Sequence, residues 1–149
     1  MIKSYWHTGF VVRDIDRAIA FYRDGLGLHL IGTKDVEGKP ISNLVGYEKA
    51  FLKEAFFSIE PGKKTSDSNI LALIEYASPR TSKAMSSERN YVAAAHIAFF
   101  VDDVDAAYER LLAHGAIKLN PPAEVVEGQK SCYIQDPDGN WIELVQLSS

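Results

Sequence analysis

The segment from His7 to Gly27 occurs twice in this chain of 149 residues. The second copy begins at His96, which lies 89 positions after His7, and reads HIAFFVDDVDAAYERLLAHG. A repeat of this length in so short a chain indicates two copies of one supersecondary unit, each beginning with a histidine. The positions that match are His7 with His96, Val12 with Val101, Asp14 with Asp103, Asp16 with Asp105 and Ala18 with Ala107.

The first copy predicts a strand followed by an amphipathic helix. Residues 5–12 are rich in aromatic and β-branched side chains, which favour a strand. Asp14 is the expected helix N-cap because its carboxylate can accept hydrogen bonds from the free amides of the first turn. Gly25 and Gly27 supply the C-terminal stop. The apolar stripe of this helix consists of Ile15, Ala18, Ile19, Tyr22 and Leu26.

Three more strands complete a first β-α-β-β-β module, over residues 5–76. They are predicted at 29–36, 50–59 and 70–76, the last being an apolar run typical of a buried strand. The segment 37–48 is predicted to be a loop. Its loop-forming residues are Gly38, Pro40, Asn43 and Gly46.

A second module follows the same plan over residues 94–147. A strand at 94–101 leads to Asp103 as N-cap and to a helix that ends at Gly115. Further strands are predicted at 117–119, 131–135 and 141–147, with a turn at 136–139 before the last one.

The two modules predict an α+β fold in one domain over residues 1–149. Each sheet would have one face covered by its helix, and the other faces would form an incomplete eight-stranded barrel-like cleft. Side chains related by the repeat would meet in this cleft. The polar linker 77–91 is long for a plain connection, which suggests a lid or a partner contact.

Charge and composition exclude some classes of function. The net charge of -4 and the pI near 5.5 give no basic face for nucleic acid. No apolar run approaches the roughly 18 residues of a membrane span, and the N-terminus has no signal-peptide core. Cys132 is the single cysteine, which fits a reducing compartment, so we expect a cytoplasmic protein.

His7, His96 and Glu143 are the candidate metal ligands. The repeat places the two histidines at equivalent positions, so the cleft would bring them face to face. Glu143 stands between Ile142 and Leu144 on a strand with no other charge, where an unpaired carboxylate needs a cation or a donor nearby. The alternatives are core histidines satisfied by hydrogen bonds and a salt bridge from Glu143 to a surface lysine.

A fourth ligand is missing from its expected place. Aligning the last strands of the two modules with an offset of 71 matches Glu143 with Ala72, which cannot bind a metal. Glu75 lies three residues further on and would point to the opposite face unless a bulge intervenes, so it is the less favoured ligand. Two histidines and one carboxylate suit one divalent metal, with Fe, Mn, Co, Ni or Zn all conceivable.

These motifs resemble the vicinal-oxygen-chelate superfamily, which includes glyoxalase I, methylmalonyl-CoA epimerase, bleomycin- and fosfomycin-resistance proteins and extradiol dioxygenases. The matching patterns are H-x(4)-V-x-D-x-x-x-A-x-x-F-Y-x-x-x-L-G-L from His7, H-x(4)-V-D-D-V from His96 and D-P-D-G-N-x-I-E-L from Asp136. The resemblance implies the same three metal ligands, a small-molecule substrate and a homodimer.

Departures from the family pattern separate the possible reactions. In glyoxalase I and the epimerase the family pattern has a Glu or Gln ligand at the position of Ala72. In glyoxalase I it also has an arginine at the position of Val11. Extradiol dioxygenases use three ligands and a tyrosine ten residues before the final glutamate, which is the position of Tyr133. Tyr133 would then hydrogen-bond a substrate oxygen, or it is an ordinary strand aromatic. An acid-base histidine of that group is absent from 124–132.

The resulting hypothesis is a metal-dependent enzyme acting on a small molecule with adjacent oxygens, in which Glu143 doubles as a general base if a ligand displaces it. A dioxygenase-like site is slightly favoured over a lyase or isomerase of the glyoxalase I or epimerase type. The alternative is a metal-free small-molecule binding or resistance protein.

Overall fold

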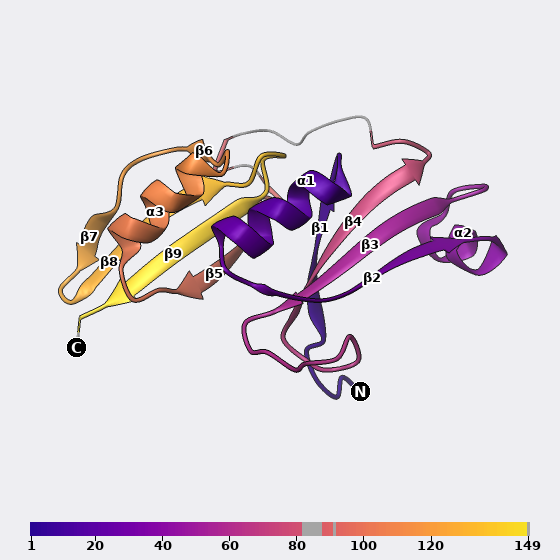
Figure 1. Cartoon of the computed structure of the whole chain (residues 1–149), viewed down its shortest axis with the longest axis horizontal. Coiled ribbons are helices and arrows are strands. Elements are labelled where there is room, and N and C mark those ends of the chain that lie inside the picture. The colour runs from indigo at the N-terminus through magenta and orange to yellow at the C-terminus, as the bar shows by residue number, and fades with distance from the viewer. Residues whose placement is uncertain (82–87, 91, 149) are drawn as a thin grey trace. The chain divides into compact units, whose positions relative to one another are not determined.

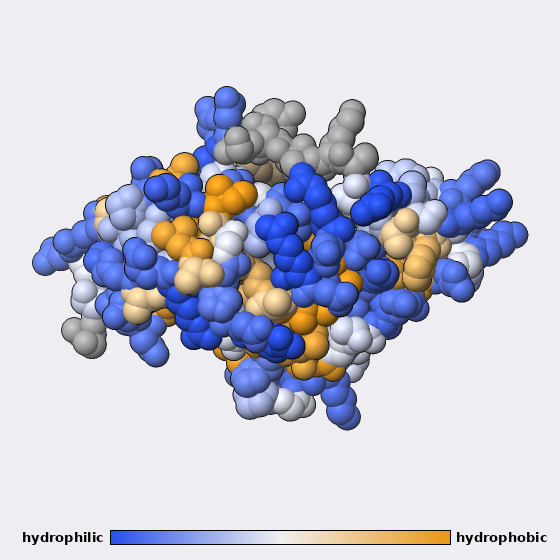
Figure 2. All heavy atoms as spheres, turned by 45° about the horizontal axis from the view of Figure 1, so that its top comes forward, coloured by the Kyte–Doolittle hydropathy of each residue, from blue (hydrophilic) through white to orange (hydrophobic). Residues whose placement is uncertain are grey.

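The computed structural model describes residues 1–81, 88–90 and 92–148. The chain separates into two compact units. Unit 1 comprises Met1–Arg23 and Gly27–Lys83, and unit 2 comprises Asp24–Leu26 and Ala84–Ser149, each as far as its residues are described. No helix among the described residues is long and apolar enough to cross a membrane. The face shown in Figure 2 is mainly hydrophilic, with separate hydrophobic patches.

Unit 1 is a four-stranded sheet with one face covered by a helix (Figure 1). The strand order is β1-β4-β3-β2, with β1 parallel to β4 and the other neighbours antiparallel. Helix α1 contacts β3 and β4. Its elements are β1 (His7–Val12), α1 (Ile15–Ala20), a π-helical turn (Phe21–Gly25), β2 (His29–Glu37), α2 (Lys39–Val45), β3 (Phe51–Ser58) and β4 (Ile70–Ser78).

Unit 2 repeats this plan with one additional strand. The order is β5-β9-β8-β6, with β7 pairing against β8, and α3 contacts β8 and β9. The prediction of two β-α-β-β-β modules is confirmed. Its elements are β5 (His96–Phe100), α3 (Val104–Ala113), β6 (Ile117–Lys118), β7 (Ala123–Val126), β8 (Gln129–Gln135) and β9 (Trp141–Leu147).

Both main helices begin where the sequence predicts. The carboxylate of Asp14 accepts from the amide of Arg17 at 3.0 Å, and that of Asp103 accepts from the amide of Ala106 at 2.9 Å. The first helix continues as a wider π-helical turn that ends at Gly25. The left-handed φ of +80° at Gly27 then turns the chain toward β2 at little cost for a residue without Cβ.

A second cap holds each helix to the last strand of its own sheet. The carboxylate of Glu75 on β4 accepts from the first amide of α1, that of Ile15, at 2.8 Å. The side-chain oxygen of Gln146 on β9 accepts from the first amide of α3, that of Val104, at the same distance of 2.8 Å. The two caps differ in residue type but occupy equivalent places in the repeat.

The sheet register gives the same equivalence independently. His7 pairs with Ile70 and Gly9 with Ala72, whereas His96 pairs with Trp141 and Ala98 with Glu143. Ala72 of unit 1 therefore occupies the position that Glu143 occupies in unit 2, as the offset of 71 predicted.

The predicted loop at 37–48 is wrong, because residues 39–45 form helix α2. Pro40 lies in the first turn, where its missing amide is tolerated, and Gly46 closes the helix with a φ of +76°. Ile41 is buried against Ala50 and Leu52, so tertiary packing stabilises a segment whose composition is typical of a loop.

The predicted total of eight strands is one short of the nine in the described residues, because β7 was missed. Its residues are all exposed, so it lacks the buried alternation by which strands are recognised. Of the predicted linker 77–91, residues 77 and 78 belong to β4, and 82–87 and 91 lie outside the described residues.

The second caps predict a measurable contribution to stability. Glu75→Ala should lower the free energy of unfolding by about 2 kcal/mol, because a charged acceptor is lost from a part-buried helix start. Gln146→Ala should lower it by about 1 kcal/mol, since its acceptor is neutral. Urea unfolding measures both. Glu60→Ala, at a side chain 74% exposed, is the control and should change stability by less than about 0.5 kcal/mol. If all three variants have the same free energy of unfolding, the prediction that the two caps contribute to stability is wrong.

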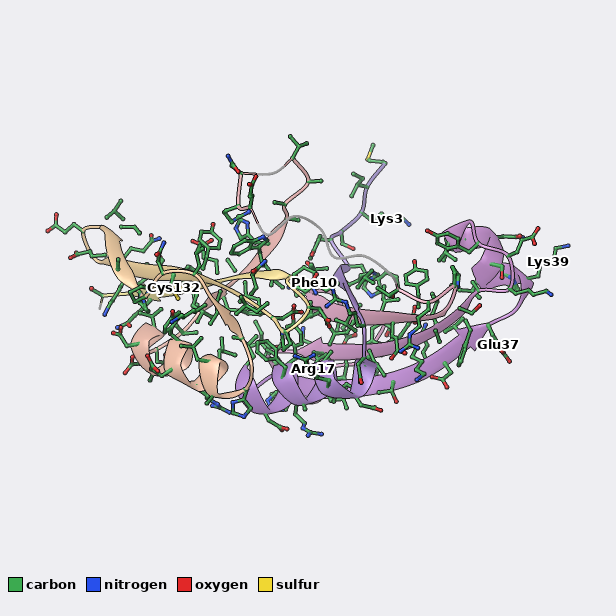
Figure 3. All side chains as sticks on the ribbon, turned by 90° about the horizontal axis from the view of Figure 1, so that it is seen from above. Lys3, Phe10, Arg17, Glu37, Lys39 and Cys132 are labelled. Carbon is green, nitrogen blue, oxygen red and sulfur yellow. The ribbon has the colours of Figure 1, made fainter. Side chains whose placement is uncertain are left out.

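Cys132 is predicted to be an unreactive thiol in the folded protein. It lies on β8, at the place labelled in Figure 3. Its side chain is buried. Burial raises the pKa of this thiol from 9.0 to about 11, with the carboxylates of Asp105 and Glu143 adding to the shift. Alkylation by iodoacetamide should therefore rise with pH toward a midpoint near 11. In urea the midpoint should fall to the ordinary value.

The same shift sets the sign of a pH effect on stability. The fold keeps the thiol protonated, so the contribution of Cys132 is present below pH 9.0 and is lost as the pH rises through about 11. If the pH midpoint of alkylation is the same in folded and unfolded protein, Cys132 is accessible and the predicted pKa shift is wrong.

Candidate functional site

The candidate site residues of unit 2 lie on the sheet face that α3 does not cover. Gln146 points toward α3, since its side chain caps that helix. Glu143 is three positions away on the same strand, so it faces the opposite side. Tyr133 is the cross-strand partner of Glu143 on β8, and His96 on β5 pairs with Trp141, two residues before Glu143. The fold thus gathers three predicted site residues on one face.

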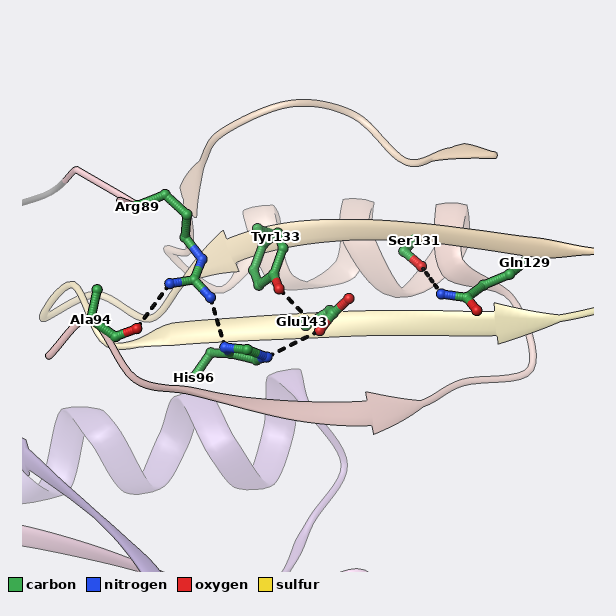
Figure 4. Close-up of polar contacts among 7 residues, drawn as sticks. All are labelled: Arg89, Ala94, His96, Gln129, Ser131, Tyr133 and Glu143. Carbon is green, nitrogen blue, oxygen red and sulfur yellow. Dashed lines mark hydrogen bonds and ion pairs between the residues drawn. The ribbon is translucent and has the colours of Figure 1, made fainter. Parts of the chain in front are cut away.

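These side chains meet at one carboxylate oxygen (Figure 4). The hydroxyl of Tyr133 donates to Oε2 of Glu143 at 3.2 Å, and Nε2 of His96 lies 3.2 Å from the same oxygen. The side chain of Glu143 is 20% exposed and that of His96 is 34% exposed. The carboxylate is therefore held by two neighbours and remains accessible from solvent.

Arg89 lies on the other side of the His96 ring (Figure 4). Its Nη2 is 2.6 Å from Nδ1 of His96, and its Nη1 donates to the carbonyl of Ala94 at 3.0 Å. The guanidinium carbon lies 4.5 Å from the ring centroid of Tyr133 and 5.4 Å from that of Trp141, in cation–π geometry. The guanidinium is thus fixed by two hydrogen bonds and two rings.

This contact determines which nitrogen of His96 carries the proton. A guanidinium can only donate, so Nδ1 must be the unprotonated acceptor. The proton of the imidazole is then on Nε2, from which it is donated to Glu143. In the contact between His96 and Glu143 the imidazole Nε2 therefore donates and the carboxylate Oε2 accepts.

His7 is placed at the start of β1, in unit 1. Its Nδ1 is buried and has no hydrogen-bond partner among the described residues. The ring of Trp6 packs edge-on against it, with centroids 4.3 Å apart. An imidazole nitrogen that is buried without a partner is a costly arrangement that a bound ion would relieve.

Ala72 and Glu75, the two other positions considered for a fourth ligand, both take part in contacts that stabilise unit 1. Ala72 is buried with Phe56 and Ile70 in an apolar cluster of unit 1. Glu75 faces α1, where one of its oxygens caps the helix and the other lies 3.7 Å from Nζ of Lys53. Its carboxylate therefore already has two partners on the helix-covered side of the sheet.

The residues of unit 2 suit a divalent metal in part. A histidine and a glutamate side by side are donors that such ions accept. In the described part of the chain, however, His, Cys, Asp and Glu side chains form no group of three or more that could hold an ion. His7 belongs to unit 1, so the set His7, His96 and Glu143 stays a prediction.

Arg89 is the site residue that sequence reasoning missed. It falls in the polar linker 77–91, beside other charged residues such as Arg80 and Glu88. No spacing or hydrophobic pattern distinguishes it from them. The only available signal was the unusual length of the linker, which predicted a lid or a partner contact without naming a residue.

Two curated proteins are similar to this chain over nearly its whole length. A protein named lactoylglutathione lyase from Haemophilus influenzae is 30% identical over 146 residues, which cover 96% of this chain and 92% of the relative. The uncharacterized protein YwbC from Bacillus subtilis is 28% identical over 147 residues, covering 98% of this chain and 99% of the relative.

A glyoxalase family protein from Bacillus cereus has the same fold, with a TM-score of 0.87 at 23% identity over 100% of this chain and 97% of that chain. Residues 5–144 match the Glyoxalase/Bleomycin resistance protein/Dioxygenase superfamily. The chain belongs to this superfamily, as the repeat and the motifs that begin at His7, His96 and Asp136 indicated.

Proposed function

We propose that the protein is a divalent-metal-dependent enzyme that catalyses proton transfer on a small molecule with adjacent oxygens, as a lyase or isomerase. The observation that carries this proposal is the environment of Glu143. Its Oε2 accepts from Tyr133 and from His96, each at 3.2 Å, on an accessible sheet face. Glu143 is thus an accessible carboxylate with two donors beside it, and it would act as a general base once a ligand has displaced it from the metal.

His7, His96 and Glu143 would hold the metal. When bound, the ion would supply Lewis acidity to a substrate oxygen. The proposal requires unit 1 and unit 2, of one chain or of two copies in a homodimer, to provide ligands to the same ion. The buried Nδ1 of His7, which has no hydrogen-bond partner among the described residues, supports its inclusion. A cytoplasmic location also stays a prediction.

Three residues of the site have distinct proposed roles. Glu143 takes a proton from the substrate carbon or oxygen next to the reacting group. Tyr133 keeps the carboxylate in place through its hydroxyl and is a hydrogen-bond donor near the substrate. Trp141 is buried below the guanidinium of Arg89, so it supports this face rather than contacting the reacting atoms.

A ring-cleaving dioxygenase is the second candidate. One specific feature favours it: Ala72 occupies the place equivalent to Glu143, so the repeat supplies three ligands instead of four. Three protein ligands leave open positions of the kind that oxygenases of this superfamily use. Tyr133 would then hydrogen-bond the substrate oxygen. Oxygen consumption separates this reaction from proton transfer.

The proposal predicts a metal content that depends on the three ligands. Protein purified without chelator should contain close to one divalent ion per chain. His7→Ala, His96→Ala and Glu143→Ala should each lose most of it, since removal of one of three ligands weakens binding strongly. His29→Ala, at an exposed histidine, is the control. Metal analysis by mass spectrometry gives the result. No metal in the unmodified protein, with unchanged melting in chelator, would favour a metal-free binding protein.

The proposed base predicts a graded loss of activity. Glu143→Gln should reduce turnover by about 100-fold or more, because a general base is lost. Tyr133→Phe should reduce it by about tenfold while the metal content is retained, because one hydrogen bond to a charged group is removed. Hemithioacetals, acyl-CoA esters and catechols, each with several metals, form the assay panel. Full activity of Glu143→Gln in a metal-loaded protein would contradict the proton-transfer role.

A further inference from the structure

We propose that Arg89 is an internal cation that competes with the metal ion for His96. In this proposal the Arg89–His96 hydrogen bond and metal binding exclude each other, and Arg89 leaves the imidazole when the ion enters. The inference rests on the proposed function only in that an ion binds at His96. It assigns a role to a residue outside the expected ligand set.

The exclusion follows from the number of protons on the imidazole. Nδ1 accepts from Arg89 at 2.6 Å, so the single proton is on Nε2. An ion bound at Nε2 would need the lone pair of that nitrogen, so the proton would have to move from Nε2 to Nδ1. Nδ1 would then present a donor to the guanidinium, which has only donors. An ion bound at Nδ1 instead would need the place that Nη2 occupies.

The present position of Arg89 is incompletely satisfied. Its Nε is buried and has no hydrogen-bond partner among the described residues. Its two acceptors, the carbonyl of Ala94 and the imidazole of His96, are both neutral. A buried donor without a partner raises the free energy of this arrangement, which lowers the cost of moving the guanidinium away from His96.

Other contacts keep the guanidinium close after it leaves His96. The carbonyl of Ala94 and the rings of Tyr133 and Trp141 do not depend on which nitrogen of His96 carries the proton. Arg89 is therefore a positioning residue. Its hydrogen bond keeps the imidazole of His96 in place and, through His96, the carboxylate of Glu143. The same hydrogen bond lowers the affinity for the ion, because it occupies a nitrogen of the imidazole that the ion needs.

The first test measures Zn²⁺ affinity by titration calorimetry of the full chain. Arg89→Met keeps a long apolar stem over the rings and removes the donors, so it should bind Zn²⁺ about tenfold or more tightly than the unmodified protein. Lys130→Met is the matched control, because it removes a cation of the same sheet that pairs with Asp105. Its affinity should stay within about twofold. Equal affinities of Arg89→Met and the unmodified protein would overturn the proposal.

The second test uses the unmodified protein and so does not depend on the folding of a variant. Nitrogen NMR of ¹⁵N-histidine-labelled protein, with His96→Gln for assignment, reports which nitrogen carries the proton. Without metal the proton should be on Nε2, and with Zn²⁺ it should be on Nδ1. A proton on Nδ1 before metal is added would overturn the competition. If Zn²⁺ binds neither the unmodified protein nor Arg89→Met, both the competition and the metal-dependent function are overturned, whereas equal and measurable affinities overturn the competition alone.

Discussion

Parallel pairing between the first and last strands of each unit is the constraint on which the candidate site depends. In unit 2 this register puts His96 beside Trp141 and therefore near Glu143, two residues further along the same face. The neighbouring side chains of β9 point to α3, where Gln146 caps the helix. A shift of one residue would bury Glu143 under the helix and expose the core residues Ile142 and Leu144.

The two units use this constraint for different purposes. In unit 2 the helix-free face carries Glu143, Tyr133 and His96 in one hydrogen-bonded group. In unit 1 the equivalent of Glu143 is Ala72, which is buried with apolar neighbours. This face thus carries a polar group in unit 2, whereas the equivalent position of unit 1 is packed among apolar side chains. The caps, by contrast, are preserved in both, because every helix start needs acceptors for its free amides.

The main elements could be predicted from the repeat, because matching hydrophobic patterns and matching caps recur at fixed offsets. Glu143 is a candidate for another reason, because it is the one charge on its strand, and the structure places it 3.2 Å from His96. Helix α2 could not, since Gly38, Pro40 and Gly46 are equally typical of a loop and the deciding contact is the burial of Ile41 against β3. Arg89 could not either. Its position over Tyr133 and Trp141 comes from tertiary structure alone, and a polar linker carries no periodic signal.

The hydrogen bonds around His96 form a directed chain that explains how the site stays ordered. Arg89 donates to His96, His96 donates to Glu143, and Tyr133 donates to the same carboxylate oxygen. Every donor points toward Glu143, so these neighbours stabilise the negative charge of its carboxylate. An imidazole in the middle of such a chain must accept on one nitrogen and donate on the other. Any ligand that takes the lone pair of His96 has to reverse this direction, and Arg89 is the member of the chain that must then move.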